Sequence, residues 1–168
     1  MKKWIIATYA IVFAVIGVSA YVYATKVQEP VEQAVVIEQP EPPTVEELLT
    51  LVNAERAKVG VAPLQLDVRL NQSAQRKVDN MIAFNDDDHI DQEGVHGYMY
   101  IPDTGIKCIS GSENLVSHND RTNFNSAADA VTAWMNSTSH RQAMLDPKYD
   151  FTGFAIKDWA IVQHFCNI

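Results

Sequence analysis

The sequence predicts a domain of the α+β class. Amphipathic helical segments come first, from residue 44 onward, and two short strand-like runs close the chain. Runs of helices followed by runs of strands are typical of α+β proteins, whereas alternating elements would predict a doubly wound sheet. A chain of 168 residues holds one such domain with appendages.

Two helices are predicted at the start of the domain. Thr44 and Glu47 fit a capping box, so the first helix begins there, and it should end near Gly60. Asp67 has the position of an N-cap for the second helix. The apolar stripe of this second helix consists of Leu70, Ala74, Val78, Met81 and Ile82.

A loop and two shorter helices follow. Residues 84–112 show no periodicity and contain several glycines, which predicts a long ordered loop. Asn125 or Ser126 should cap a third helix whose apolar face includes Trp134, and residues 140–145 form a fourth helical piece.

The chain ends on a predicted hairpin. Residues 151–156 and 159–166 are rich in aromatic and β-branched residues, as strands are. Lys157-Asp158 is the expected turn between them, although this pair is not one of the strong turn dipeptides.

Residues 1–25 predict a membrane anchor or a signal peptide. Two lysines precede residues 4–24, an uncharged run that would be roughly 31 Å long as a helix, about the thickness of a bilayer core. Lysines before this run and acidic residues after it place the N-terminus in the cytoplasm and the rest of the chain outside. Small residues before possible cleavage points at Ala20 and Ala24 leave a cleaved signal open as the alternative to a retained anchor.

Residues 26–43 predict a linker, and residues 44–168 the exported domain. Four prolines prevent the linker from forming a helix, and its glutamates keep it solvated and extended. The net charge of −8 argues against an open nucleic-acid surface, which has to be basic. The protein is therefore expected outside the cytoplasm, anchored to the membrane or secreted, with no nucleic-acid partner.

The stretch FNDDDHIDQEG, residues 84–94, raises the question of a cation site. A calcium loop of the EF-hand type fails on spacing, since counting from Asp86 places Ile90 and Asp91 where a ligand and the required glycine should stand. A calcium site of irregular geometry remains open. The alternative is a solvated acidic rim around His89.

His89 and His140 differ from the other histidines by their context. Each lies at a helix end, in a polar turn between helices that share a core, and helix ends converge on the rim of a domain, where clefts form. Glu113, in the segment GSENL, could point into such a cleft and polarise a histidine, or simply keep a strand edge soluble. The sequence has no HExxH motif and no CxxC pair.

An ordered set of segments resembles a known family. The segments are LLTLVNAERAKVGVAPLQLDVRLNQSAQRKVDNM, GSENL, AVTAWMNSTSHRQAML, YDFTGFAI and WAIVQHF. Together they resemble the CAP superfamily (cysteine-rich secretory proteins, antigen 5 and pathogenesis-related 1), and within it the bacterial SCP-like extracellular branch. The resemblance covers residues 44–168 and implies an α/β/α sandwich, with a small, mainly antiparallel sheet between helical layers.

The resemblance also implies a central cleft lined by two histidines and two acids. The first histidine falls on His89, the acid of the GEN motif on Glu113, and the second histidine, from the bacterial SPGHR motif, on His140. The second acid would align near Ser137 and is missing here, as in many bacterial relatives. Ser112 replaces the GEN glycine, and SPGHR is STSHR in this chain.

Three interpretations of this cleft follow. In the first, His89 and His140 bind a divalent ion such as Zn²⁺ and leave positions for water or a ligand, while Glu113 orients one imidazole or ligates directly. In the second, the cleft binds its ligand without metal. In the third, the three side chains only form a hydrogen-bonded network that holds loops together.

Serine catalysis is a further alternative. Ser137 lies three residues before His140, and Glu113 would orient the base, but serine is common at helix ends for capping, and no GxSxG elbow occurs. The missing acid and nucleophile motif favour a module that binds a small ligand, lipid, glycan, peptide or envelope protein over a metal-dependent, peptidase-like hydrolase. A purely structural role as an envelope spacer fits the linker but leaves the cleft residues unexplained.

Cys108 and Cys166 are expected to form a disulfide. In the fold that the resemblance implies, both segments contribute to the central sheet, and an exported protein keeps such a bond oxidised. Arg56, within the segment NAER, is expected to pair internally and to tie its helix to a loop.

Overall fold

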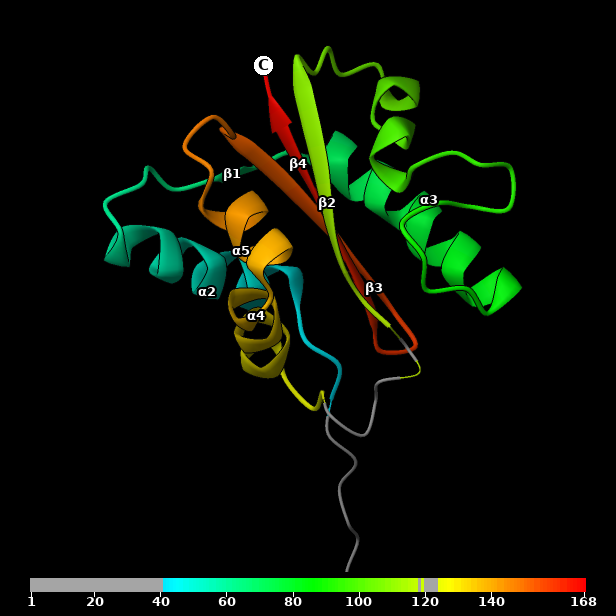
Figure 1. Cartoon of the computed structure of the whole chain (residues 1–168), viewed down its shortest axis with the longest axis horizontal. Coiled ribbons are helices and arrows are strands. Elements are labelled where there is room, and N and C mark those ends of the chain that lie inside the picture. Colours follow the sequence, from blue (N-terminus) through cyan, green and yellow to red (C-terminus); the bar gives the residue numbers. More distant parts are fainter. Residues whose placement is uncertain (1–40, 118, 120–123) are drawn as a thin grey trace, which may run out of the picture. The chain divides into compact units, whose positions relative to one another are not determined.

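A four-stranded sheet forms the centre of the domain. The computed structural model describes residues 41–168, apart from 118 and 120–123, and in this part of the chain the strands are arranged in the order β1-β3-β4-β2 (Figure 1). The strands are β1 (Gln65–Leu66), β2 (Ser110–Val116), β3 (Phe151–Lys157) and β4 (Ala160–Asn167). β1 pairs with β3 in parallel, and the other two pairs are antiparallel. The expected small, mainly antiparallel sheet is confirmed.

Helices cover both faces of this sheet. They are α2 (Val45–Lys58), α3 (Val68–Phe84), α4 (Ala127–Asn136) and α5 (Thr138–Leu145), with two short 3-10 helices, η1 (Gly97–Tyr100) and η2 (Pro102–Thr104). α2, α4 and α5 lie on one side of the sheet and α3 on the other (Figure 1). The predicted α+β class and the α/β/α layering are therefore confirmed.

α2 begins where the capping box predicts. The hydroxyl of Thr44 accepts a hydrogen bond from the backbone N–H of Glu47 (3.2 Å), and the carboxylate of Glu47 accepts one from the backbone N–H of Thr44 (2.8 Å). The helix ends at Lys58, close to the predicted end. Its buried residues Leu48 and Val52 join the core cluster between this helical layer and the sheet.

α3 covers the opposite face of the sheet. Asp67 caps it, as predicted, by accepting a hydrogen bond from the backbone N–H of Arg69 (2.9 Å). The residues that it packs on β3 and β4 are Ala74, Val78 and Met81. Asn85 follows in a left-handed conformation, which a short polar residue tolerates. The chain therefore turns away from α3 directly before the loop that carries His89.

Ser126 caps the start of α4, and Ser137 lies between α4 and α5. Ser126, one of the two predicted caps, accepts a hydrogen bond from the first turn of α4 (3.2 Å). Ser137 ends α4 and precedes α5. Trp134 is buried and donates its indole N–H to the carbonyl oxygen of Leu115 in β2 (3.1 Å). α4 is thereby fixed against β2, and α5 starts nearby with His140 in its first turn.

Arg56 is buried and ties α2 to the loops beside it. Its guanidinium donates to the carbonyl oxygens of Ala62 (2.7 Å), Met144 (2.7 Å), Asp146 (3.1 Å) and Tyr149 (3.0 Å). The expected internal pairing of Arg56 is confirmed, and its partners are backbone carbonyls of the loop after α2, of α5 itself and of the loop after α5. Because these loops flank α2 and α5, one side chain holds together the layer that carries His140.

Cys108 and Cys166 form the expected disulfide. Their Cα atoms are 5.5 Å apart, and the bond closes a sequence separation of 58 residues. Cys166 stands opposite Gly111 in the register of β4 with β2. The bond therefore fixes the start of β2 against the end of β4, in addition to the backbone ladder.

Two predicted features differ from the structure. The hairpin turn consists of Asp158 and Trp159, one residue later than predicted, because Lys157 is still part of β3. Both turn residues have positive φ, as the tight two-residue hairpin turn requires. Residues 84–112 are not one continuous loop, since they contain η1, η2 and the start of β2 at Ser110.

The predicted membrane segment, residues 4–24, lies outside the described residues. In the ranges that are described, no helix is long and apolar enough to cross a bilayer. The anchor or signal of residues 1–25 and the linker of residues 26–43, of which only 41–43 are described, stay predictions.

Candidate functional site

The structure brings together three of the four predicted site residues. His89 lies in the loop after α3, Glu113 in the middle of β2 and His140 in the first turn of α5. Nδ1 of His89 is 2.7 Å from Oε1 of Glu113, and the ring centroids of His89 and His140 are 5.9 Å apart. We call these three residues the histidine site.

Ser137 does not join the histidine site through a hydrogen bond. Its hydroxyl lies 3.3 Å from the hydroxyl of Ser139. It stands between α4 and α5, where its backbone N–H caps the end of α4, while its hydroxyl makes no capping hydrogen bond. The geometry therefore gives no support to Ser137 as a nucleophile that His140 would activate.

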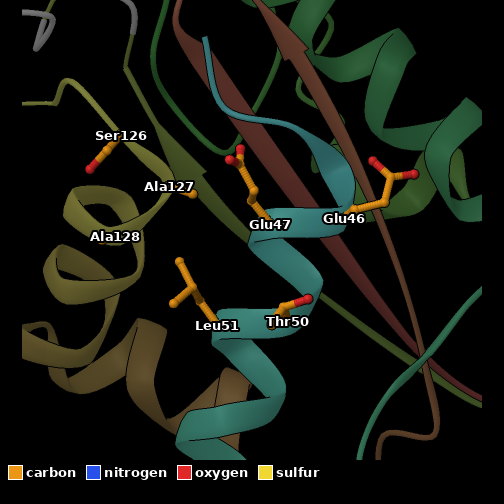
Figure 2. Close-up of a pocket in the computed structure, with 7 residues that line it drawn as sticks. All are labelled: Glu46, Glu47, Thr50, Leu51, Ser126, Ala127 and Ala128. Carbon is orange, nitrogen blue, oxygen red and sulfur yellow. The ribbon is translucent and has the colours of Figure 1, made fainter. Parts of the chain in front are cut away.

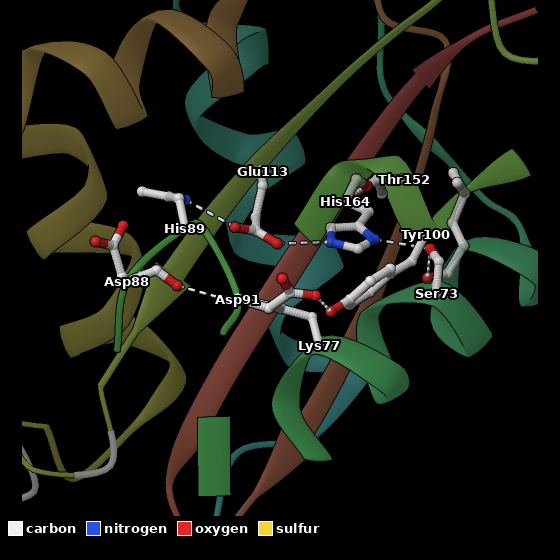
Figure 3. A network of polar contacts seen from close by, with 10 residues as sticks. Ser73, Lys77, Asp88, His89, Asp91, Tyr100, Glu113, Thr152 and His164 are labelled. Atoms are coloured by element: carbon white, nitrogen blue, oxygen red, sulfur yellow. Dashed lines mark hydrogen bonds and ion pairs between the residues drawn. The ribbon is translucent and has the colours of Figure 1, made fainter. Parts of the chain in front are cut away.

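The carboxylate of Glu113 is held from two sides (Figure 3). Oε1 faces His89, and Oε2 lies 2.9 Å from Nε2 of His164. The side chain of Glu113 is only 2% exposed, whereas that of His89 is 43% exposed. Because each carboxylate oxygen already accepts an imidazole N–H and the side chain is almost fully buried, Glu113 serves to orient His89.

The ionisation of the site follows from burial and from these contacts. Burial by itself raises the pKa of Glu113, but the hydrogen bonds from His164 and His89 outweigh it, so this pKa lies below that of an ordinary glutamic acid. Burial lowers the pKa of His140, and the nearby His89 lowers it further. At neutral pH the site therefore holds an ionised carboxylate and, at His140, a neutral imidazole with a free lone pair.

α5 is fixed to β2 beside the histidine site. The side-chain amide of Asn114 donates to the carbonyl oxygen of His140 (3.2 Å). The rings of His89 and His140 are inclined by 54°. Within the described residues no hydrogen bond reaches the ring of His140. The pair therefore consists of one imidazole that is oriented by an acid and one that is placed only by its backbone and packing.

His164 and Ser73 extend the site into the core, and neither was among the residues predicted from the sequence. His164 is fully buried, and its Nδ1 lies 2.7 Å from the hydroxyl oxygen of Ser73 on α3. A continuous series of hydrogen bonds thus joins Ser73, His164, Glu113 and His89 (Figure 3). Ser73 is 1% exposed, so this arrangement is not a nucleophile open to an external substrate.

Lys77 organises the loop that presents His89. Its side chain is buried, and its ammonium group donates to the carbonyl oxygen of Asp88 (2.6 Å). Asp91 accepts hydrogen bonds from two backbone N–H groups of the loop and from the hydroxyl of Tyr100. The expected solvated acidic rim therefore needs correction for Asp91, which holds the loop in shape. Among the residues described, no group of three or more His, Cys, Asp or Glu side chains could hold a metal ion.

Gly97 packs directly against the carboxylate of Glu113. Its backbone N–H donates to the carbonyl oxygen of His89 (2.9 Å). A Cβ atom at this position would lie 2.0 Å from Oε2 of Glu113 and 2.8 Å from Cδ of Lys77. The backbone of η1 therefore limits how far the carboxylate can move, and any larger residue would displace it.

The donor set of the histidine site fits a zinc-type ion in part. Glu113 occupies Nδ1 of His89, which leaves Nε2 as the possible metal ligand, and a carboxylate behind the histidine is common at zinc sites. His140 supplies a second neutral imidazole. Two protein ligands are fewer than the three of catalytic zinc sites, so water or a bound ligand would have to complete the coordination.

A separate hollow of about 440 Å³ lies between the N-terminal ends of α2 and α4 (Figure 2). Its lining residues are Glu46, Glu47, Thr50, Leu51, Ser126, Ala127 and Ala128. None of them belongs to the histidine site, and Glu47 and Ser126 already serve as helix caps. The candidate site is therefore identified by the convergence of two imidazoles and a carboxylate, and not by the volume of a hollow.

Known proteins share this sequence pattern and fold. The sequence profile of the CAP family, described as the cysteine-rich secretory protein family, matches residues 49–160. The uncharacterised protein YkwD of Bacillus subtilis is 33% identical over 108 residues, which are 63% of this chain and 39% of that protein. An extracellular protein of Bacillus anthracis that contains an SCP domain superposes with a TM-score of 0.66, at 18% identity over 74% of this chain and 40% of that one. An outer surface protein of Borrelia burgdorferi superposes with a TM-score of 0.64, at 20% identity over 73% of this chain and 90% of that one.

These similarities concern the domain. The chain spans about 40% of the length of the two Bacillus proteins, and the solved structures, at such low identity, show a shared fold alone. The family profile covers more than half of the chain and includes all three residues of the histidine site. The chain therefore belongs to the CAP family of cysteine-rich secretory proteins.

Proposed function

We propose that this protein is an exported CAP-domain binding module whose histidine site takes a small ligand between His89 and His140. The observation that carries the proposal is the spacing of the two rings, 5.9 Å between centroids, with His89 partly exposed and oriented by Glu113. Two imidazoles at this spacing can both contact one bound ligand.

A zinc-type ion is the cofactor that the donor set favours. Imidazole nitrogens suit Zn²⁺ and similar transition metals, whereas Ca²⁺ and Mg²⁺ prefer carboxylate and carbonyl oxygens. The two oxygens of Glu113 are already engaged, which disfavours the hard cations at this place. Because two protein ligands leave coordination positions open, the ion would be shared with water or with a donor group of a small ligand, lipid, glycan, peptide or envelope protein.

The alternative function, a peptidase-like hydrolase, has less support. Such chemistry needs an activated nucleophile or a carboxylate that can serve as a base. In the described part of the chain, neither His89 nor His140 is hydrogen-bonded to a hydroxyl, and both oxygens of Glu113 already accept a hydrogen bond from an imidazole. Ser137 stands near the place where the second acid of the family would align, and it carries no carboxylate.

An extracytoplasmic location is part of the proposal. Two proteins of similar fold are named as an extracellular protein and an outer surface protein. The uncharged run of residues 4–24 predicts export of everything that follows it. Attachment to the membrane through residues 1–25, or release after cleavage, belongs to the same proposal.

Isothermal titration of the metal-free full chain with Zn²⁺ tests the proposed site. We expect binding that weakens by at least about tenfold in His89→Ala and in His140→Ala, since each variant removes one of two ligands. His96→Ala is the matched control, because His96 is an exposed imidazole that stacks on Tyr98 outside the site. Undiminished binding in both site variants would sink the two-histidine site.

A peptide-hydrolysis screen separates the binding module from the hydrolase. The purified protein, with and without added Zn²⁺, would be incubated with a mixed peptide library and analysed by mass spectrometry. We expect no cleavage beyond that seen with the double variant His89→Ala/His140→Ala. Cleavage that disappears in that double variant would favour the hydrolase.

A further inference from the structure

We infer that His164 and Ser73 are positioning residues of the histidine site. They fix the carboxylate of Glu113 from the inside, so that Glu113 holds His89 with its proton on Nδ1 and leaves Nε2 free for a ligand. The identity of that ligand rests on the proposed function, whereas the positioning itself rests on geometry.

The pairing of β2 with β4 brings His164 to Glu113. The two residues stand directly opposite each other in the antiparallel register, so their side chains leave the sheet on the same face. α3 packs on that face and contributes Ser73, whose hydroxyl oxygen lies 2.7 Å from Nδ1 of His164 and 2.9 Å from the carbonyl oxygen of Leu70. Strand pairing and helix packing therefore fix both nitrogens of a fully buried ring.

The ionised carboxylate of Glu113 determines which of the imidazole nitrogens carry hydrogen. An ionised carboxylate only accepts hydrogen bonds, so the facing nitrogens, Nδ1 of His89 and Nε2 of His164, both carry hydrogen. For a neutral His89, this leaves the lone pair on Nε2, the nitrogen that a ligand can reach. The hydroxyl of Ser73 has one hydrogen, which goes either to Nδ1 of His164 or to the carbonyl oxygen of Leu70, and in the second case Nδ1 donates to the hydroxyl oxygen. In both arrangements Nε2 of His164 carries the hydrogen that faces Glu113.

The position of His164 in β4 points to more than packing. Its neighbours on the same face of the strand, Val162 and Cys166, are apolar, and an apolar residue at position 164 would fill the core without any polar requirement. Without His164, Oε2 of Glu113 would lose its partner in a place that is 2% exposed. The carboxylate would then rotate toward other donors, and the orientation of His89 would be lost with it.

The neighbouring residue offers a matched control. Gln163 is as buried as His164, but it belongs to the opposite face of β4, where its side-chain amide donates to the hydroxyl of Thr152 (3.1 Å). Gln163→Leu therefore disturbs the core of the same strand and leaves the contacts of Glu113 intact. Comparing it with His164→Leu separates positioning from general destabilisation.

The test is the tautomer of His89, read from the ¹⁵N chemical shifts of its ring in the metal-free full chain. We expect the Nδ1–H form in the wild type and in Gln163→Leu, and its loss in His164→Leu. His164→Gln, whose amide can donate to Glu113, should restore it in part, and Ser73→Ala should weaken it. In the same series, Zn²⁺ affinity should fall about 10–100-fold in His164→Leu and stay within about threefold of the wild type in Gln163→Leu.

The outcomes distinguish this inference from the proposed function. If the wild type binds no Zn²⁺, the proposed ion is wrong, yet loss of the Nδ1–H form in His164→Leu would still support the positioning role. If His89 keeps that form in a folded His164→Leu variant, the inference is overturned. Should His164→Leu fail to fold, the tautomer of His89 in Ser73→Ala and in His164→Gln serves as the test instead. A His89 that keeps its wild-type tautomer in Ser73→Ala but loses it in Gln163→Leu would contradict the inference.

Discussion

Replacing Gly97 by alanine should displace the carboxylate of Glu113. The added Cβ would lie 2.0 Å from Oε2, where real contacts essentially never fall below 3.0 Å, so the atoms must separate by at least 3.0 − 2.0 = 1.0 Å. The carboxylate is held by hydrogen bonds of 2.7 and 2.9 Å, and a movement of that size breaks one or both. Because a hydrogen bond to a charged group contributes about 1.5–3 kcal/mol, Gly97→Ala should lower the free energy of unfolding by about 2–5 kcal/mol.

Urea unfolding of the metal-free protein, followed by tryptophan fluorescence, measures this loss. Gly111→Ala is the control, since the nearest atom to its added Cβ is the flexible end of Ile101, at 3.2 Å. We expect the control to lose about 1 kcal/mol or less. The Nδ1–H form of His89 should also disappear in Gly97→Ala and persist in Gly111→Ala. Equal stability of the two variants, or an unchanged His89 in Gly97→Ala, would refute the placement of Glu113 against η1.

Three further predictions follow from the same contacts. Arg56→Met should lower the free energy of unfolding by about 3 kcal/mol or more, because four carbonyl oxygens lose a buried donor, and a loss below about 1 kcal/mol in urea unfolding would contradict the role of Arg56. The double variant Cys108→Ala/Cys166→Ala should lose about 4 kcal/mol in the chain-entropy picture, and alkylation of two thiols in the unreduced native protein would exclude the bond. The lowered pKa of Glu113 stabilises the fold above its ordinary value of 4.5, and this contribution is lost as the pH falls from there through the folded-state pKa. Stability of the metal-free wild type should therefore decline with acid below pH 4.5 more steeply than that of Glu113→Gln, and parallel curves would contradict the assignment.

The helices could be predicted because their signals are local. Thr44, Asp67 and Ser126 cap their helices through contacts within three residues, so the sequence contains the whole interaction. The hairpin turn lies one residue later than predicted because Asp158 and Trp159 are neither glycine nor asparagine, although both adopt positive φ. That conformation is imposed by the pairing of the two strands, which a local pattern does not contain.

Three residues of the site, His89, Glu113 and His140, could be predicted, whereas the contact of Glu113 with His164 could not. His89, Glu113 and His140 stand at positions that the family resemblance identifies, and the structure brings them together. The contact between Glu113 and His164 depends on the register of two strands about 50 residues apart, which no spacing in the sequence reveals. A histidine within the apolar run WAIVQHFC was nevertheless a signal, since a buried ring needs partners.

The polar residues of α3 carried a similar signal. Ser73 and Lys77 lie three residues after Leu70 and Ala74, on the same helical face as the apolar stripe, and both are buried. Helical periodicity was therefore a signal that could have indicated two polar side chains entering the core on this face, although neither was among the predicted residues. What it could not supply is their partners, which come from β4 and from the loop before η1.

Anomalous diffraction from a crystal soaked in Zn²⁺ tests the shared site of His89 and His140 most directly. We expect a zinc peak about 2.0–2.1 Å from Nε2 of His89 and from a ring nitrogen of His140, with Nδ1 of His89 still bonded to Glu113. A peak on the acidic loop instead, or a peak that contacts Glu113 with His140 turned away, would contradict the site proposed for this protein.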